Sequence, residues 1–338
     1  MNEHKIIVAG CGSMANTWID YAVQRENATI VGLVDIFEES AIKMAEKRKL
    51  DVPTFTSLST AITESGAEIV FDATIPASHK QVVETALKAG CHVFGEKPMA
   101  ETMEDAREEV RLVKETGKHY FVMQNRRYLK QIRAFQSILK ADVIGDIESI
   151  HADFFIGPHF GGFRDVMDNV LILDMAIHTF DQARFITGLD PVSVYCHEYN
   201  SKSSWYKGNA SAICIFEMEN GTVFTYNGSW CAEGLNTSWE SEWRVTGSKG
   251  SAKWDGHHAP VCEVVDKSQP EAFIRPVKTV EVPLNWAGRD GHFGCLDEMF
   301  EALEQGRLAE TDCTDNIKSI SMVLGAIESA KTGKKITL

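Results

Sequence analysis

A glycine-rich turn near the N-terminus has the residue types and spacing of a dinucleotide-binding site. Gly10 and Gly12 follow an apolar run, and Ala15 stands where a third small residue lets helix and strand pack closely. A second apolar run, residues 30–34, ends in Asp35, whose carboxylate can accept hydrogen bonds from ribose hydroxyls. No arginine follows it directly to receive a 2′-phosphate, so the pattern predicts NAD rather than NADP. The alternative is a glycine turn with a purely structural role.

Asp174 and His178 form a second group with chemical potential. They stand four residues apart in a segment whose apolar positions have helical spacing, so both side chains are expected on one helix face. A carboxylate beside an imidazole can fix its tautomer and raise its basicity, which makes His178 a candidate acid–base group. Two alternatives stay open. The pair can be an ordinary helix-surface pair, or part of a metal site, although a zinc site would lack its third and fourth ligands; no metal is predicted.

Lys97 is the third candidate. It follows the apolar run 92–95 and stands between Glu96 and Pro98. A lysine after a strand is usually only solvated. At the mouth of a nicotinamide pocket, however, a partly desolvated lysine can stabilise a developing alkoxide.

The elements that must position these groups alternate between strands and helices. Apolar runs at 69–72, 92–95 and 119–123 are separated by helical patterns, which predicts a doubly wound parallel sheet covered on both faces. Ligands of such sheets bind beyond the carboxyl ends of the strands. The residues predicted to bind the cofactor are therefore Gly10, Cys11, Gly12, Ser13, Met14, Asp35, Thr74, Ile75, Pro76, His79, Glu96, Lys97 and Gln124.

The pattern changes after about residue 145. A long helical stretch near 168–187 is followed by strand-like runs separated by turn signals, which predicts an antiparallel sheet. These runs are residues 192–199, 210–217, 222–229, 240–246 and 278–282, and helical patterns return at 290–305 and 312–331. Six of the seven tryptophans lie in this half, where they can pack the sheet, form a subunit interface or stack on a sugar.

Composition excludes several classes of function. The chain has 338 residues, 44% of them hydrophobic, and a formal net charge of −14, which disfavours nucleic acid as a partner. No apolar stretch reaches the roughly 20 residues of a membrane span, and the N-terminus lacks a signal-peptide pattern, so a cytoplasmic location is expected. The eight cysteines are scattered without a C-x-x-C pair, which predicts reduced, mostly buried thiols.

Three motifs, in order and spacing, resemble the Gfo/Idh/MocA oxidoreductase family, which includes inositol 2-dehydrogenases and glucose–fructose oxidoreductases. They are the glycine turn with Asp35, the triplet at residues 96–98, and the Asp174–His178 segment that runs into Asp181 and Gly188. The resemblance covers nearly the full length. It implies a Rossmann domain at 1–124 that binds NAD, and an α/β domain at 125–338 for substrate binding and oligomerisation. The second domain would contain a large, open, mostly antiparallel sheet that often forms the interface of a homodimer or homotetramer.

The resemblance also implies the chemistry. The expected reaction is hydride transfer between nicotinamide and a hydroxyl carbon of a sugar, inositol or related polyol. Lys97, Asp174 and His178 would be the catalytic set, with Glu96 and Lys97 near the nicotinamide ribose. The peptide bond between Lys97 and Pro98 is expected to be cis.

The segment before Asp174 departs from the family pattern. Many relatives carry a glycine-rich stretch directly before this helix, whereas here the paired glycines stand earlier, at residues 161–162. Substrate contacts are therefore expected from a wider set, namely Arg127, Tyr128, His159, Arg164, Asn169, Asp174 and His178.

Two other functions remain open on the sequence. One is a redox-neutral glycosidase or lyase that uses NAD transiently, through oxidation, elimination, hydration and reduction. The other is a sensor that binds NAD and catalyses nothing. The presence of Lys97, Asp174 and His178 argues against the sensor.

Overall fold

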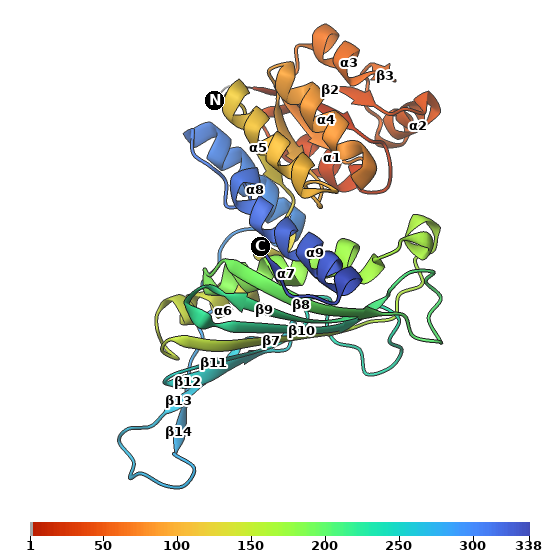
Figure 1. The fold of residues 1–338 in the computed structure, drawn as a ribbon. Coiled ribbons are helices and arrows are strands. Elements are labelled where there is room, and N and C mark those ends of the chain that lie inside the picture. The colour runs from red at the N-terminus through yellow and green to blue at the C-terminus, as the bar shows by residue number, and fades with distance from the viewer. Residues whose placement is uncertain (1–2) are drawn as a thin grey trace. The chain divides into compact units, whose positions relative to one another are not determined.

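The computed structural model describes residues 3–338, which divide into two units. The first unit comprises the chain up to Asn125 together with His292–Ile320, and the second comprises Arg126–Gly291 and Ser321–Leu338. Within the described residues each unit has its own sheet, one of six strands and one of nine (Figure 1). Helix α9 (Cys313–Thr332) begins in the first unit and ends in the second.

The sheet of the first unit is parallel, with the strand order β3-β2-β1-β4-β5-β6. Its strands are β1 (His4–Ala9), β2 (Ala28–Val34), β3 (Thr54–Phe55), β4 (Ile69–Asp72), β5 (His92–Gly95) and β6 (Tyr120–Val122). Apolar runs form these strands because both faces are covered, and every residue of β4 is buried. The predicted doubly wound sheet is confirmed. Its order reverses between β1 and β4, where such sheets bind ligands.

Local signals set the ends of the helices between these strands. Thr102 Oγ1 accepts a hydrogen bond from the backbone N–H of Asp105 at 3.1 Å and caps one helix, which Gly117 ends with a φ of 68°. These helices are α1 (Ala15–Gln24), α2 (Glu38–Arg48), α3 (Leu58–Ser65), α4 (Pro76–Lys88) and α5 (Met103–Thr116), the one capped by Thr102.

A segment from the far end of the chain completes the core of the first unit. In α8 (Gly291–Gln305), the ring of Phe300 lies 6.1 Å from that of Phe71 in β4 and 5.1 Å from that of Phe94 in β5. The backbone N–H of Val122 donates to the carbonyl of Thr311 at 2.9 Å. The helices predicted at 290–305 and 312–331 are confirmed as α8 and α9.

The sheet of the second unit has the order β14-β13-β12-β11-β7-β10-β9-β8-β15. Only β7 and β10 pair in parallel among its described strands, so the predicted, mostly antiparallel sheet is confirmed. The strands are β7 (Ile147–Phe155), β8 (Pro191–Tyr199), β9 (Ser211–Met218), β10 (Val223–Ser229), β11 (Glu242–Gly247), β12 (Gly250–Trp254), β13 (Val261–Val265), β14 (Val277–Val280) and β15 (Ile336–Thr337).

Four of these strands were not predicted, namely β7, β12, β13 and β15. The central strand β7 is the instructive case, because it pairs with both β11 and β10. Ile150 and Phe154 are buried on one of its faces, while His151 and Asp153 point to the other. The polar side chains interrupt the apolar run and hide the strand from a search for continuous hydrophobicity.

One face of this sheet is covered by helices and the other is open (Figure 1). Helices α6 (Lys130–Lys140) and α7 (Ile177–Thr187) are joined by a hydrogen bond of 2.6 Å from Gln136 Nε2 to the carbonyl of Phe185. The helix predicted near 168–187 begins as a π-helical turn, η3 (Leu171–Ala176), that continues into α7. Three short 3₁₀ turns complete the elements, η1 (Asn125–Arg127), η2 (Gly162–Val166) and η4 (Glu219–Gly221).

All eight cysteines are buried as thiols, as predicted. Burial raises the pKa of the Cys313 thiol well above its usual range, so this group stays protonated. Within residues 3–338 no helix combines the length and the apolar character that a membrane span needs.

Candidate active site

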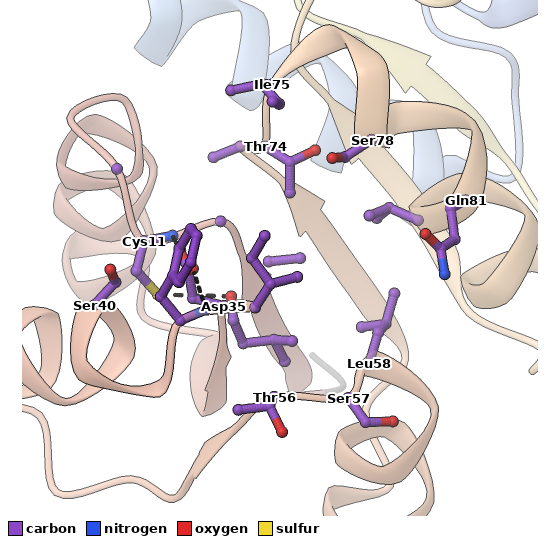
Figure 2. Close-up of a pocket in the computed structure, with 18 of the residues that line it drawn as sticks. Cys11, Asp35, Ser40, Thr56, Ser57, Leu58, Thr74, Ile75, Ser78 and Gln81 are labelled. Carbon is purple, nitrogen blue, oxygen red and sulfur yellow. Dashed lines mark hydrogen bonds between the residues drawn. The ribbon is translucent and has the colours of Figure 1, made fainter.

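A cavity of about 500 Å³ opens at the carboxyl end of β1, beside the glycine turn (Figure 2). In the view of Figure 2, the start of α3 lies across this cavity from the exit of β4. The lining includes the predicted residues Gly10, Cys11, Gly12, Asp35, Thr74 and Ile75. It also includes polar residues that the sequence did not single out, namely Ser40, Thr56, Ser57, Ser59, Ser78 and Gln81. The two-residue strand β3 is too short to be predicted, so the residues that follow it carried no signal.

The two glycines of the turn have different roles. Gly10 has a φ of 85°, and a Cβ there would lie 2.7 Å from the carbonyl oxygen of Ala73 and the amide nitrogen of Thr74. A Cβ at Gly12 would meet no atom within 4 Å. Gly10 is therefore required by the fold of the chain itself, whereas Gly12 leaves its backbone accessible to a ligand.

Asp35 is held in place by two backbone N–H groups. Its Oδ2 accepts from Cys11 at 2.8 Å and its Oδ1 from Phe37 at 2.9 Å. A carboxylate has further lone pairs, so Asp35 can still accept hydrogen bonds from vicinal ribose hydroxyls. Burial, with the charge of Asp35, raises the pKa of the Cys11 thiol to about 12, so that thiol is neutral. This wall of the cavity fits a nucleotide with an unphosphorylated ribose.

A buried pair supports the exit of β4. Oδ1 of Asp72 accepts from the Thr74 amide at 3.0 Å and from its hydroxyl at 2.5 Å, while Oδ2 lies 2.9 Å from His79 Nδ1. Burial by itself lowers the pKa of His79, but the charge and hydrogen bond of Asp72 outweigh burial and raise it. His79 is fully buried and is not part of the cavity lining, so its contact is with the protein.

The remaining predicted residues of this unit follow the next strands. The Oε1 of buried Glu96 accepts a hydrogen bond from Trp18 Nε1 at 2.8 Å. The Lys97–Pro98 bond is cis, as predicted, and Lys97 is half-buried. Gln124, directly after β6, is buried, and its side-chain amide bonds to none of residues 3–338. Ser13, Met14 and Pro76 lie at the starts of α1 and α4, outside the cavity lining.

In the second unit, Asp174 and His178 lie where η3 passes into α7, and both are buried. Turns of π-helix are rare and are frequent at functional sites. Oδ2 of Asp174 accepts a hydrogen bond from Arg164 Nε at 2.5 Å. A carboxylate and an imidazole within one helical turn of each other, beside a guanidinium, can accept, hold and return a proton.

The structure sorts the predicted substrate contacts by their partners. Arg127 forms a buried bidentate pair with Asp181, with N–O distances of 2.7 and 2.6 Å. Asn169 Nδ2 donates to Glu198 Oε2 at 2.7 Å. Arg164, one of the candidates outside the helix, donates a hydrogen bond to Asp174.

Two further candidates have aromatic surroundings. His159 is exposed and stacks on Trp205, with ring centroids 3.7 Å apart. Tyr128 is buried, and its ring lies 4.7 Å from the guanidinium carbon of Arg133. These two ring contacts belong to the packing of the second unit.

Arg126 was not among the residues predicted to contact the substrate, although it lies in the segment after β6. Its Nη1 lies 3.3 Å from Glu240 Oε1, and its Nη2 lies 3.7 Å from the Sδ of Met175, the residue that follows Asp174 in the chain. Nothing in the sequence distinguishes it from Arg127, which follows it. Within residues 3–338 no group of three or more His, Cys, Asp or Glu side chains is placed to hold a metal ion.

Two family models match the chain. One, described as the oxidoreductase family with an NAD-binding Rossmann fold, matches residues 4–124, and the other, the GFO/IDH/MocA C-terminal domain, matches residues 132–253. The chain is 28% identical over 347 residues to the uncharacterized protein y4oX of Sinorhizobium fredii, covering 98% of this chain and 95% of that protein. It is 23% identical over 351 residues to a D-apiose dehydrogenase of Rhizobium rhizogenes, covering 100% of this chain and 98% of that enzyme.

A similar fold is found in a solved structure of an oxidoreductase from Agrobacterium radiobacter in complex with NAD+, L-tartaric acid and magnesium. The TM-score is 0.86 at 22% sequence identity, and the match covers 99% of this chain and 98% of that chain. This likeness shows the fold.

Proposed function

This chain belongs to the Gfo/Idh/MocA oxidoreductase family and binds NAD, and from that premise we propose that it transfers a hydride between nicotinamide and a hydroxyl carbon of a sugar, inositol or related polyol. The observation that carries the proposal is the cavity beside Gly10, Gly12 and Asp35, whose lining suits an adenosine ribose without a 2′-phosphate. The sugar named for the D-apiose dehydrogenase supports the substrate class.

The first unit would hold the cofactor. Asp35 would accept hydrogen bonds from the ribose, and the backbone at Gly12 with the start of α1 would receive the diphosphate. Thr74 and Ile75 form the opposite wall, supported from behind by Asp72. The bound cofactor would supply the hydride acceptor in its oxidised form, NAD, and the hydride donor in its reduced form, NADH.

Three side chains would carry the substrate chemistry. Oxidation breaks a C–H and an O–H bond of the alcohol: bound NAD would take up the hydride, and the imidazole of His178 would accept the proton. Asp174 stabilises the imidazolium that forms, and the ammonium of Lys97 stabilises the negative charge that develops on the alcohol oxygen. In reduction His178 returns the proton to that oxygen. The products of oxidation are a carbonyl compound, reduced cofactor and one proton.

The direct test follows the absorbance of reduced nicotinamide. Purified protein and NAD are mixed with inositols, aldoses, sugar acids and glycosides, and we expect a substrate-dependent rise for a subset with a shared hydroxyl pattern. Cleavage of a glycoside without net reduced cofactor would instead indicate the redox-neutral reaction. Binding of NAD with neither outcome would contradict the proposal.

We also propose that the open face of the nine-stranded sheet binds a second copy of the chain, giving a dimer or tetramer. Exposed apolar side chains lie on its neighbouring strands, where Tyr195 is directly opposite Ile215, and Ile213 is two residues away on β9. Light scattering of the protein as it elutes from a size-exclusion column should give two or four times the mass of the chain. Ile215→Asp should lower that mass, and a monomeric wild-type protein would contradict the proposal.

A further inference from the structure

Arg164 is held as a flat cation beside Asp174. Its guanidinium carbon lies 5.0 Å from the ring centroid of Phe160 and 4.6 Å from that of Phe163, and its Nε donates to Asp174 Oδ2 at 2.5 Å. A free arginine side chain loses rotamer entropy when it binds a ligand. Here that entropy has already been lost in folding, because two rings and a carboxylate fix the group.

The segment that carries Arg164 is itself fixed. The carbonyl of Pro158 accepts from Trp205 Nε1 at 3.2 Å and from the Tyr206 hydroxyl at 2.7 Å, and the carbonyl of Asp165 accepts from the Lys207 amide at 2.8 Å. The loop at residues 205–207 therefore holds the segment 158–165 at both ends through hydrogen bonds.

Its aromatic side chains are nevertheless exposed. The ring of Phe160 packs 5.7 Å from that of Trp230 and 6.2 Å from that of Trp239, yet Phe160 is 51% exposed and Phe163 is 48% exposed. Apolar rings left this accessible beside a proposed catalytic carboxylate form a surface that a ligand can cover.

One edge of the guanidinium remains available. The side chain of Arg164 is 30% exposed, and among residues 3–338 only its Nε has a hydrogen-bond acceptor. The two Nη atoms thus form a planar donor pair. Such a pair matches two oxygens of one oxyanion, which is the geometry in which arginine recognises carboxylate and phosphate.

We propose that Arg164 binds an oxyanion of the substrate, so that this enzyme acts on acidic polyhydroxy compounds in preference to their neutral counterparts. The inference rests on the proposed function, because the same Asp174 that holds Arg164 is assigned to the proton-transfer pair. An oxyanion on the Nη edge brings the hydroxyl groups of that molecule towards Asp174. A carboxylate and a phosphate ester share this chemistry.

Matched substrates test the proposal. D-Glucose, D-gluconate and glucose 6-phosphate, and likewise D-xylose and D-xylonate, are compared by kcat/KM with NAD. We expect an acidic member to exceed its neutral partner by about tenfold to a hundredfold, as hydrogen bonds to a charged group would give. Arg164→Gln can still donate to Asp174 but lacks the charged fork, so the ratio should fall, through a higher KM for the acid. The carboxylate and phosphate arms distinguish the two sources of the oxyanion.

Two more variants make the result specific. Arg164→Lys keeps the charge without the planar fork and should give an intermediate ratio. Arg275→Gln removes an exposed arginine from the loop between β13 and β14 and should leave the ratio unchanged. An equal loss of activity on acid and neutral substrates in Arg164→Gln would overturn the proposal, since Arg164 would then act only on Asp174. Preference of the wild-type enzyme for the neutral members would also overturn it.

Calorimetry separates this inference from the proposed function. Gluconate and glucose 6-phosphate are titrated into the protein with NAD present. If no panel member is turned over, but an acid binds to wild-type protein and not to Arg164→Gln, then the oxyanion site stands and the proposed reaction fails. If neutral sugars are oxidised and no acid binds or reacts, the reaction stands and the oxyanion site is refuted.

Discussion

The proposed cofactor site and the proposed substrate site of this protein differ in the groups that form them. In the first unit, the backbone of the Gly10–Gly12 turn borders the cavity, and the carboxylate of Asp35 is the charged group of the lining. In the second unit, the candidate site is built from side chains, with Asp174 in an ion pair with Arg164. A backbone site depends on a few special φ/ψ positions, whereas a side-chain site can be altered by one substitution. This difference suits a family whose members share the cofactor and differ in their substrates.

Two buried carboxyl groups, one from each unit, show a second difference. Asp181 in the second unit is paired through two hydrogen bonds with Arg127. Glu109 in the first unit is fully buried, and neither of its carboxyl oxygens has a hydrogen-bond partner within residues 3–338. Burial, and then the charges of Asp105 and Asp72, raise the pKa of Glu109 to about 9. The first unit thus keeps a neutral acid in its core, while the second neutralises its carboxylate with a cation.

The largest expected effect tests the division of labour between the regions. His178→Asn should lower kcat by about 10²–10⁴-fold, because the proton acceptor is lost, while the affinity for NAD should change little. Steady-state kinetics and calorimetric titration with NAD measure the two quantities. His257→Asn removes an exposed imidazole from the same unit and serves as the control. Wild-type turnover in His178→Asn would remove this residue from the mechanism.

The glycine turn offers a matched pair of variants. Gly10→Ala should destabilise the protein without cofactor by about 2 kcal/mol or more, because the positive φ is strained and the new Cβ meets the backbone of Ala73. Gly12→Ala has open space, so it should keep that stability and weaken only the binding of NAD. Urea unfolding and NAD titration separate these outcomes. Equal loss of stability in both variants would show that the turn has a structural role alone.

The buried carboxyl group of Glu109 should make the free energy of unfolding depend on pH. Its folded pKa, about 9, lies above its ordinary value of 4.5, so between these values the folded state keeps a proton that the unfolded state has released. Stability should therefore fall by about 1.4 kcal/mol for each unit of rising pH in this window. Glu109→Gln is neutral at every pH and should remove this part of the slope. Urea unfolding of both proteins across the window measures it, and identical slopes would show that Glu109 is ionised when folded.

The smallest expected effect concerns the cofactor. Asp35→Asn keeps a side-chain acceptor for Cys11 but removes the charge that repels a 2′-phosphate. The ratio of kcat/KM for NAD to that for NADP should fall by about tenfold, consistent with the loss of one hydrogen bond to a charged group. An unchanged ratio would show that another residue selects the cofactor.

Features that depend on neighbours in the chain could be predicted. The strands at 69–72 and 92–95 were predicted with the bounds that they have in the structure, because a strand buried on both faces must be apolar throughout. The need for glycine at residue 10 was also visible, since the turn that requires a positive φ is local. Asp35 was found by the same logic, at the end of the second strand.

Features that depend on contacts between distant parts of the chain could not be predicted from the sequence. The sequence offered Arg127 and Arg164 equally as residues that contact the substrate. The folded structure pairs Arg127 with Asp181 and Arg164 with Asp174. The parallel pairing of β7 with β10 was hidden, because it joins segments about seventy residues apart whose patterns do not specify a partner.

The sequence by itself determined the doubly wound sheet and the glycine turn, because local sterics and hydrophobic periodicity act between near neighbours. The tertiary structure decided which charges meet and which remain unpaired. Arg164 donates to Asp174 and lies close to the rings of Phe160 and Phe163, and Glu109 is buried with no hydrogen-bond partner for its oxygens among residues 3–338. The energy of a charge depends on what surrounds it, and residues far apart in the chain supply those surroundings only after it has folded.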